Sequence, residues 1–400
     1  MNGSGRFAAS DQVAIVGYAQ SPVERHAAKP LGAVALDTAT AAIADAGLDV
    51  AQIDGFTTGA LFPAAGAHTI EDGVSIVTAN WMAEHLGVNP RWASGFQGYG
   101  QIPGTVELAV NAVASGAADY VLMHRALHNP TAKYHNNPMR EARGSMQWMA
   151  PQGYFGPLAM IALPYNEYLQ RYGASREEMA AVVVEARKNG ARIPWSFWYD
   201  KPLTADDYLA ARVIADPICM YDCDIPVDGV ASFVFTSAER AWDLPHHPVL
   251  VRGFGMGTPT TRRTPQHWPL DDIMDTAFET TRRLWEHSGL TPDDVDLPQV
   301  YDGFSPFVWF WLEALGLCPV GEAHSFVAGG GIDSDVPGAL PALSGGGAIG
   351  NGRMHGVPQM LECYLQLSGR AGDRQRAGVE VGVACHSSPH YGGAVAYRRA

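Results

Sequence analysis

An internal repeat restricts the folds open to this chain more than any other feature of its sequence. The segments QVAIVGYAQSP (12–22) and PVLVRGFGMGT (248–258) are both apolar strand patterns that end in a glycine turn. Further along come LDTATAAIADAGLDVAQIDGF (36–56) and MDTAFETTRRLWEHSGLTPDDVDLPQVYDGF (274–304). Strand and helix patterns therefore follow each other in the same order twice, which predicts two similar halves of β-α-β type.

The second segment of each half predicts the same local structure. Each reads as a helix that opens with Asp-Thr and ends at a glycine C-cap, Gly47 or Gly289. Each then passes through an acidic turn into a strand that ends in Asp-Gly-Phe, at 54–56 and at 302–304. Alternating strand and helix patterns predict mainly parallel sheets covered by helices.

An irregular region lies between the two halves and interrupts the repeat. It contains the Met- and aromatic-rich stretch SMQWMAPQGYFGPLAM and the amphipathic helix pattern SREEMAAVVVEARKNGARI. We interpret it as a large insertion, and long insertions often carry ligand contacts. The predicted organisation is an N-terminal half at 10–125, an inserted loop region returning to that half at 126–245, and a C-terminal half at 246–400.

Charge and hydropathy exclude several classes of partner. The 400-residue chain has a formal net charge of -14, which argues against nucleic acid and anionic membrane surfaces as general partners. The sequence contains no run of about 20 apolar residues, so no transmembrane helix is predicted. The N-terminal residues lack the basic and apolar regions of a secretory signal, so we expect a cytoplasmic protein.

The cysteines predict neither a disulfide framework nor a metal site. There are five, an odd number in a long chain, which favours a reducing compartment. Cys219 and Cys223 form a CxxxC pair, but no second Cys or His pair at zinc spacing accompanies it. All five cysteines lie in the second part of the chain, after residue 218.

Six segments in one order carry a family resemblance. They are AIVGYAQSP, ELAVNAVASGAADYVLMHRA, RVIADPICMYDCDIPVDGVASFVFTSAERA, VYDGFSPFVWFWLEALGLCPVGEA, ALSGGGAIGNGRMHGVPQMLE and CHSSPHYGGAVAYRR. Together with the repeat, they resemble the thiolase superfamily across nearly the whole chain. The resemblance implies an α/β thiolase fold: two βαβ-type halves in a layered α-β-α-β-α core, with an inserted loop domain. That fold brings two helix N-termini to one site, where backbone N–H groups favour negative charge.

The sequence departs from a thiolase at the position of the nucleophile. Thiolases pass the acyl group through a cysteine at the start of the central helix, and that position falls at or beside Tyr99. No cysteine occurs anywhere in the first half. An ordinary Claisen thiolase mechanism is therefore not expected.

Groups capable of acid/base chemistry remain at the other positions that the resemblance marks. Tyr301 stands where sterol-carrier-protein-type thiolases have a histidine, and Arg353 stands at the histidine of the glycine-rich loop, with His355 two residues on. The final hairpin offers His386 and Tyr391. Retro-aldol cleavage of a β-hydroxyacyl-CoA uses a base, an acid and enolate stabilisation, and it requires no acyl-enzyme.

One branch of the superfamily, the lipid-transfer-protein-type aldolases of steroid side-chain degradation, resembles the sequence in these respects. Its members lack the thiolase cysteine, carry a Tyr-Asp motif where Tyr301-Asp302 stands, and work with a small OB-fold/zinc-ribbon partner subunit. The sequence departs from that branch at Arg353, where a second tyrosine is expected. The predicted catalytic residues are Tyr301, His355, Arg353, His386 and Tyr391, and the predicted substrate-binding residues are Gly346, Gly347, Tyr99 and Phe304.

Two other functions stay open at this stage. One is an acyltransferase with an unconventional nucleophile such as Cys385, and the other is a non-catalytic subunit that binds acyl-CoA. Asp302 is predicted to cap the helix that follows it rather than to react. We expect no metal and no cofactor beyond coenzyme A as part of the substrate. The family resemblance also implies a homodimer formed through an edge strand of the first half.

Overall fold

The computed structural model describes residues 5–59, 73–74, 76–96, 101–128, 144, 146–154, 156–257 and 269–400. Nine of the described strands form one sheet in the order β3-β2-β4-β7-β1-β8-β11-β10-β9. Those of the first half are β1 (Val13–Gln20), β2 (Gly55–Gly59), β3 (Trp92–Phe96), β4 (Tyr120–Leu127) and β7 (Gly229–Ser237). Those of the second half are β8 (Val249–Met256), β9 (Leu297–Gln299), β10 (Val381–His386) and β11 (Gly393–Arg399).

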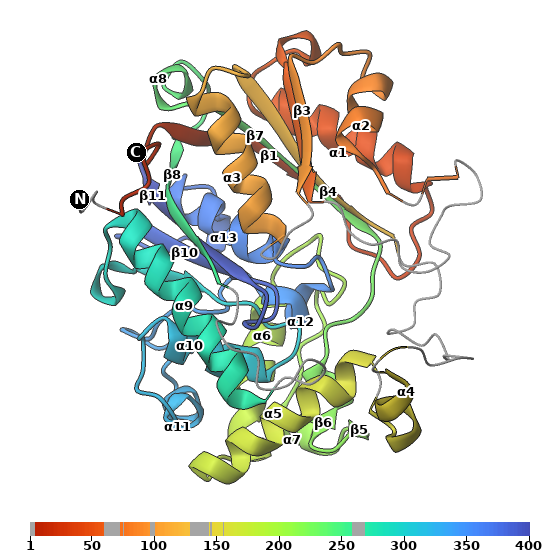
Figure 1. The fold of residues 1–400 in the computed structure, drawn as a ribbon, viewed down its shortest axis with the longest axis vertical. Coiled ribbons are helices and arrows are strands. Elements are labelled where there is room, and N and C mark those ends of the chain that lie inside the picture. Colours follow the sequence, from red (N-terminus) through yellow and green to blue (C-terminus); the bar gives the residue numbers. More distant parts are fainter. Residues whose placement is uncertain are drawn as a thin grey trace.

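The predicted repeat is confirmed by the way in which the strands pair. The two halves meet where β1 pairs antiparallel with β8, at Ala14–Leu250 and Ile15–Val249. Moving outwards, β7, β4 and β2 follow β1 in one direction, and β11, β10 and β9 follow β8 in the other. The halves therefore repeat one strand order on either side of the junction (Figure 1).

The sheet is mixed, so the expectation of mainly parallel sheets is wrong. Strand β2 runs parallel to β3 and β4, and β9 runs parallel to β10, but every other pair, β4–β7 and β10–β11 included, is antiparallel. A short turn joins β10 to β11, and a connection of that length permits only antiparallel pairing.

The repeat matches in space with a different register from the one that the sequence suggested. Asp54 accepts hydrogen bonds from Asp119 N and Tyr120 N at the start of β4. Its counterpart is Asp296, which accepts from Glu380 N and Val381 N at the start of β10. The two Asp-Gly-Phe strings are thus not equivalent: the first opens β2, whereas the second follows β9.

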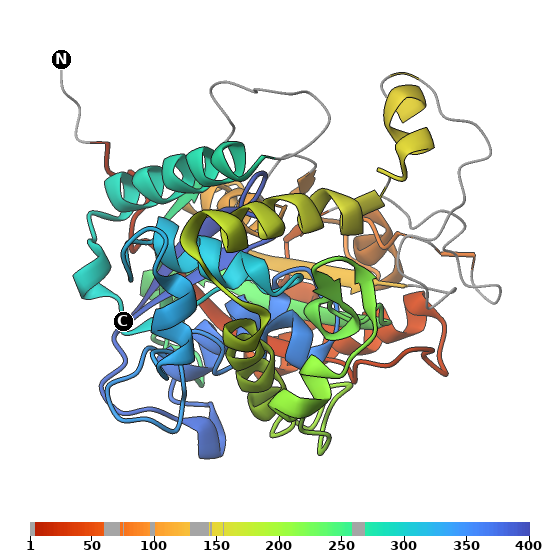
Figure 2. The ribbon, with the colours of Figure 1, turned by 90° about the horizontal axis from the view of Figure 1, so that it is seen from below.

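Side chains along each strand face opposite sides of the sheet in turn, and they contribute to three separate apolar clusters. Three layers of helices therefore enclose the two sheet halves, which gives five layers. In β1, Val13 and Ile15 pack with α3 (Gln101–Ala114) and α13 (Val357–Leu367) between the halves. Ala14 and Val16 pack with α1 (Leu31–Asp45) on the outer face of the first half. The outer face of the second half is covered by α9 (Leu270–Ser288) and α10 (Pro306–Ala314), and α5 (Gly156–Tyr172) lies beside α9 (Figure 2). The predicted thiolase-type layering is confirmed.

The two covering helices begin earlier than predicted. Asp37-Thr38 and Asp275-Thr276 lie inside α1 and α9, where each threonine hydroxyl donates to the carbonyl four residues before it. Both helices instead start directly after a proline N-cap, Pro30 or Pro269. The helix ends agree with the prediction: Gly289, in the left-handed region, is the C-cap of α9, and Gly47 follows the cap residue of α1.

The segment between β4 and β7 leaves the sheet and packs against the second half (Figure 1). Its elements are α4 (Met146–Met149), α5, α6 (Arg176–Gly190), α7 (Ala205–Leu209), β5 (Val213–Ala215) and β6 (Ile218–Cys219). At the end of α6, a Cβ on Gly190 would lie 1.9 Å from Gly350 O, so only glycine allows α6 to touch α12 (Gly347–Asn351). The remaining helices are α2 (Ala79–His85), α8 (Ala238–Ala241) and α11 (Ala323–Ala328).

Among the described residues, no helix is both long and apolar enough to cross a membrane. Every residue of α10 is buried, so the aromatic run that follows Tyr301 belongs to the core. The limits predicted for the three parts of the chain stay a prediction.

Candidate functional site

Tyr301 lies just beyond β9, at the carboxyl end of a strand whose neighbour β10 runs parallel to it. Its side chain is 7% exposed and lies folded over Gly303, where a Cβ would come within 2.3 Å of the phenol oxygen. The ring also stacks against Phe307 at 6.3 Å. Tyr301 is therefore held in one place by a glycine beneath it and the first turn of α10 beside it.

Asp224 is a carboxylate close to Tyr301, and the sequence analysis did not single it out. Its backbone N–H donates to Gly303 O at 3.1 Å, which ties the segment before β7 to the turn after Tyr301. Burial and the nearby Asp224 raise the pKa of Tyr301 well above its ordinary value, with Tyr391 adding to the effect. Burial, again with Asp224, raises the pKa of Tyr391 to about 12.

The cation of Arg353 acts in the opposite direction on both tyrosines but does not prevail over burial. Tyr301, Tyr391, Arg353 and Asp224 therefore lie within electrostatic reach of one another. Both phenols are protonated at neutral pH in this arrangement. A resting phenolate at Tyr301, generated by Arg353, does not fit the structure.

Arg353 and His355 belong to a short loop, Gly352–Gly356, that joins α12 to α13. The loop is anchored by Arg353 N, which donates to Ile225 O at 2.9 Å, and by the buried Met354, which packs on Gly229. His355 has a φ of 51°, which is uncommon for a residue other than glycine. The loop therefore holds the imidazole in a conformation that its surroundings must maintain.

Two buried side chains contact this loop from the ends of two strands. Arg125, the sixth residue of β4, places its Nη2 at 3.3 Å from His355 Nδ1, and its Nη1 donates to Gly59 O. His386, the last residue of β10, has its Nδ1 at 2.9 Å from Gly356 O. Burial lowers the pKa of the Arg125 guanidinium to about 9 and that of His386 to about 3, so the first is cationic and the second neutral at neutral pH.

Asp302 does not cap the helix that follows it, and that prediction is wrong. Its carboxylate accepts hydrogen bonds from Ala348 N at 2.5 Å and Ile349 N at 3.0 Å, at the start of α12. Gln359 Nε2 donates to the same carboxylate. Asp302 thus caps a helix 45 residues away in sequence, since α10 already begins with Pro306, which needs no N–H partner.

Gly346 and Gly347 lie at the N-terminus of α12, both buried and both with a positive φ. A Cβ on Gly347 would meet the Asp302 carboxylate at 2.2 Å, and one on Gly346 would meet Gly190 at 2.8 Å. Packing alone thus requires glycine at both positions. Phe304 is buried edge-on to Phe307 at 5.6 Å. Tyr99 lies outside the described residues.

One cysteine, Cys223, lies next to this cluster: it precedes Asp224 and forms an isolated bridge with Phe304, and burial raises the pKa of its thiol well above the ordinary value. Cys385 is fully buried, burial raises its pKa well above the ordinary thiol value, and it belongs to the apolar cluster on the outer face of the second half. All five cysteines are free thiols. Among the described residues, no group of three or more His, Cys, Asp or Glu is placed to hold a metal ion.

A cavity of about 220 Å³ reaches Asp224 from the inserted segment. Its walls are mainly apolar, and Arg187 lines it with the guanidinium 3.7 Å from the Trp198 ring. Burial lowers the pKa of Arg187 to about 10, which leaves it cationic, and its Nη2 donates to Lys201 O at 2.8 Å. Arg187 Nε is buried with no hydrogen-bond partner among the described residues.

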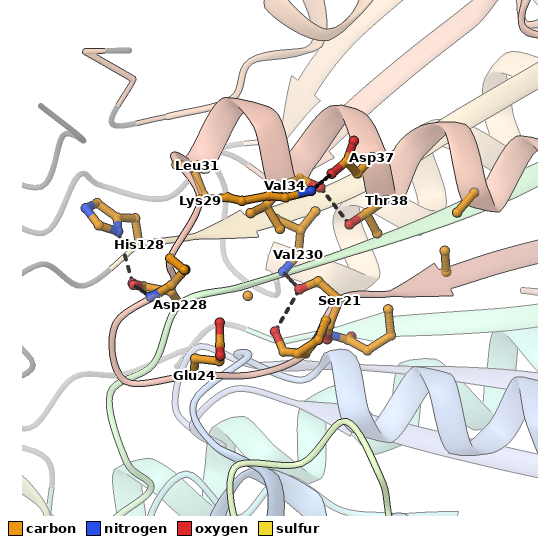
Figure 3. Close-up of a pocket in the computed structure, with 17 residues that line it drawn as sticks. Ser21, Glu24, Lys29, Leu31, Val34, Asp37, Thr38, His128, Asp228 and Val230 are labelled. Atoms are coloured by element: carbon orange, nitrogen blue, oxygen red, sulfur yellow. Dashed lines mark hydrogen bonds and ion pairs between the residues drawn. The ribbon is translucent and has the colours of Figure 1, made fainter. Parts of the chain in front are cut away.

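A larger cavity, of about 400 Å³, lies beside α1, the helix that covers the outer face of the first half (Figure 3). His128 pairs with Asp228 at 3.0 Å at one end of it, and Lys29 pairs with Asp37 at its rim. It contains none of the predicted site residues. The roles predicted for those residues stay predictions, but the structure does bring Tyr301, Tyr391, Arg353 and His355 into one region, with Arg125 and Asp224 among them.

The Asp302 carboxylate gives a prediction about stability and pH. Burial raises its folded pKa to about 7, above the value of about 3.9 for a free carboxyl. Ionisation therefore opposes folding, and the favourable contribution, complete below about pH 4, is lost as the pH rises through about 7. We expect the unfolding free energy of the wild type, minus that of Asp302→Asn, to fall by about 2–4 kcal/mol between about pH 4 and pH 8 in urea titrations.

The exposed pair of Asp37 and Lys29 offers a matched control. The same difference measured with Asp37→Asn should stay within about 0.5 kcal/mol over this pH range, because exposed pairs contribute little. A difference for Asp302→Asn that stays constant or rises with pH would contradict the prediction.

Comparison with known proteins agrees with the fold. Residues 263–396 match the family model described as thiolase C-terminal domain-like. The solved structure of an "Ltp2-ChsH2(DUF35) aldolase" superimposes with a TM-score of 0.83, at 27% identity over 98% of both chains. Human mitochondrial 3-ketoacyl-CoA thiolase shares the fold at a TM-score of 0.68 and 15% identity, over the full length of both chains.

Two relatives are similar over nearly their whole length. The chain is 33% identical over 372 residues to the 17-hydroxy-3-oxo-4-pregnene-20-carboxyl-CoA lyase of Mycobacterium tuberculosis, covering 90% of this chain and 92% of that one. It is 30% identical over 367 residues to the steroid side-chain-cleaving aldolase of Thermomonospora curvata, covering 89% and 90%. The protein therefore belongs to the thiolase superfamily, in its branch of steroid side-chain aldolases.

Proposed function

We propose that this protein cleaves the Cα–Cβ bond of a β-hydroxyacyl-CoA with a bulky, steroid-type acyl group. The products are a shorter acyl-CoA and a ketone or aldehyde. The observation that carries the proposal is a cluster of groups capable of acid/base chemistry, in which Tyr301 and Tyr391 lie within electrostatic reach of Arg353 and Asp224. The enzyme is a carbon–carbon lyase with the thiolase fold. Its two relatives are named as a lyase and an aldolase.

The reaction needs three things from the site. A base removes the proton of the β-hydroxyl, the Cα–Cβ electron pair moves into the thioester as an enolate, and an acid returns a proton to the α-carbon. The raised pKa of Tyr301 favours the acid role, because the phenol keeps its proton at neutral pH. Asp224, the carboxylate beside both tyrosines, is the candidate base.

The name of the mycobacterial relative suggests a substrate to test. It places a hydroxyl on carbon 17 and a CoA-linked carboxyl on carbon 20 of a steroid, which is a β-hydroxyacyl thioester. Cleavage between these carbons would leave a ketone at carbon 17 and release the short acyl-CoA. Coenzyme A is then part of the substrate. The cleavage is redox-neutral, so the reaction needs no other cofactor.

The cavity that ends at Asp224 offers a path for the thioester. Its apolar walls suit a pantetheine or acyl chain, and Arg187 supplies a cation with unused hydrogen-bonding capacity. We propose that the acyl-CoA enters there and that Arg187 donates to one of its acceptors.

The acyltransferase alternative lacks a suitable nucleophile in Cys385. That thiol is fully buried and holds its proton at neutral pH. The free thiols accord with a cytoplasmic enzyme, which we also propose. A non-catalytic role would remain if no substrate in the assay below were cleaved.

Assembly belongs to the same proposal. Strand β3 ends the described sheet on the side of the first half, and its residues are half-buried to exposed. We propose a homodimer through this edge. The structurally similar aldolase is named for two components, one of them a DUF35 protein, so we further propose a small OB-fold/zinc-ribbon partner subunit.

The proposed cleavage makes a prediction about turnover. A steroid β-hydroxyacyl-CoA with a tertiary ring hydroxyl should be cleaved with no added free CoA, giving a ketone and a shorter acyl-CoA by mass spectrometry. Tyr301→Phe should lower kcat by about 10²–10⁴-fold and change KM little, because it removes the acid but not the binding groups. Tyr120→Phe is the control. Tyr120 is the first residue of β4, at the end of the strand away from His355, and this variant should keep wild-type turnover.

Two results would contradict this assignment. Cleavage by Tyr301→Phe at the wild-type rate would remove the phenol from the mechanism. Cleavage that requires free CoA would indicate thiolysis instead, since an aldolase consumes none.

The proposed path for the thioester can be tested at Arg187. Arg187→Met keeps the length and the apolar stem but removes the donors, so KM for the acyl-CoA should rise about tenfold or more while kcat stays similar. Arg192→Met, at an exposed arginine just after α6, is the matched control and should leave KM unchanged. An unchanged KM in Arg187→Met would exclude this path for the thioester.

The proposed assembly can be tested by mass and by mutation of the edge strand. Sedimentation equilibrium should give about twice the chain mass of 42.9 kDa for the purified chain, and co-expression with a DUF35 subunit should yield a stable complex. Replacing Ala93 on β3 by proline should break the pairing of the edge strand and leave a monomer. A wild-type monomer at micromolar concentration would refute the homodimer.

A further inference from the structure

Arg125 and His386 are structural equivalents in the two halves. Gly55 pairs with Val121 in the first half, and its counterpart Leu297 pairs with Gly382 in the second. Four residues further along β4 and β10, this register matches Arg125 to His386. Both side chains are buried, at 1% and 0% exposure. The repeat thus brings two polar groups to matching positions near the carboxyl ends of β4 and β10.

Both groups contact consecutive residues of the same loop. Arg125 Nη2 is 3.3 Å from His355 Nδ1, and His386 Nδ1 is 2.9 Å from Gly356 O. A Cβ on Gly356 would lie 2.5 Å from His386 Nδ1, so the loop backbone lies directly against that ring. His355 and Gly356 both have positive φ, at 51° and 93°. The loop is therefore clamped from the first half by Arg125 and from the second half by His386.

The donors and acceptors in these contacts fix the tautomer of each ring. A guanidinium only donates, so His355 Nδ1 must accept, and a neutral His355 carries its proton on Nε2. A carbonyl only accepts, so His386 Nδ1 must donate, and Nε2 of that ring keeps its lone pair. His386 Nε2 is buried with no hydrogen-bond partner among the residues that the structure describes. The two imidazoles are thus held as opposite tautomers.

We propose that Arg125 and His386 are positioning residues that set the loop and its tautomers, so that His355 serves as a hydrogen-bond donor through Nε2–H. As a donor, His355 stabilises the thioester oxygen when the enolate forms, and it leaves the base to another group. This step rests on the proposed aldolase function, but the tautomers do not. Arg125 is buried within the sheet, so it acts through His355 rather than on the substrate itself.

The tautomers can be read directly in the wild-type protein. With imidazole-¹⁵N-labelled histidine, and His355→Gln used for assignment, we expect Nε2 of His355 to show the shift of a protonated nitrogen and Nδ1 that of an unprotonated one. His386, assigned with His386→Asn, should show the reverse pattern. A proton on Nδ1 of His355 would overturn the proposal whatever the enzyme does.

Kinetics separate the donor role from a purely structural one. His355→Gln keeps an N–H near the position of Nε2 and should retain much of kcat, whereas His355→Ala should lose about 10²–10³-fold, as for an oxyanion donor. Equal loss in both variants would overturn the donor role.

Arg125 variants test the positioning role. Arg125→Met should lower kcat by about 10–100-fold with little change in KM, as loss of an orienting partner does. The His355 ¹⁵N shifts should move towards a tautomer mixture in the same variant. Arg125→Lys keeps the charge in case the methionine variant does not fold, and it should give an intermediate kcat. Wild-type kcat and unchanged His355 shifts in both variants would refute the clamp.

The same measurements keep the two proposals apart. If the wild type cleaves no β-hydroxyacyl-CoA but shows the expected tautomers, the proposed function fails and the clamp stands. If the wild type cleaves the substrate but His355 carries its proton on Nδ1, the function stands and the clamp fails.

Discussion

The antiparallel contact between β1 and β8 is the constraint on which the rest of the structure depends. It spans only two residue pairs, yet it fixes the two halves in one register. From that register it follows that the carboxyl ends of β4 and β10 lie at matching places, and that α3 and α13 share one central layer. The loop Gly352–Gly356 enters α13 between these strand ends. A loop with left-handed residues is stable there because both halves hold it.

Burial decides the chemistry of the polar groups in this region. An exposed tyrosine near an arginine would ionise more easily, but Tyr301 and Tyr391 are removed from water beside Asp224, and both keep their protons. A protonated phenol next to a carboxylate provides two different groups, the phenol as an acid and the carboxylate as a base. An aldol cleavage needs both, at the two ends of one breaking bond.

Several parts of this arrangement were predictable from the sequence. The repeated strand-helix order and the thiolase-like segments predicted the fold, and Tyr301, Arg353, His355 and Tyr391 do lie in one region. The register of the repeat was not predictable, because the two Asp-Gly-Phe strings are identical and drew the comparison away from Asp296. The helix starts were misplaced because Asp-Thr resembles a cap, while the prolines that begin both helices carry a less specific signal.

Arg125 and Asp224 were missed for a different reason. Both are charged residues that become important only through contacts across the fold, with His355 and with Gly303. A local signal did exist for Arg125, since an arginine inside the apolar strand YVLMHRAL is unusual unless it is paired or functional. Nothing local distinguishes Asp224 from Asp222 two residues earlier, which bonds Tyr208 and Ser305 and serves the core.

Strand alternation in the final hairpin separates the thiol of Cys385 from the imidazole of His386. Successive side chains of β10 face opposite sides of the sheet, so Cys385 and His386 cannot both face the central layer. The structure directs His386 to the loop and Cys385 into the outer apolar cluster. A shift of one residue would exchange the two, but each ladder bond to β11 and β9 opposes it. The register of the sheet therefore directs the thiol away from the loop Gly352–Gly356, and burial keeps it protonated.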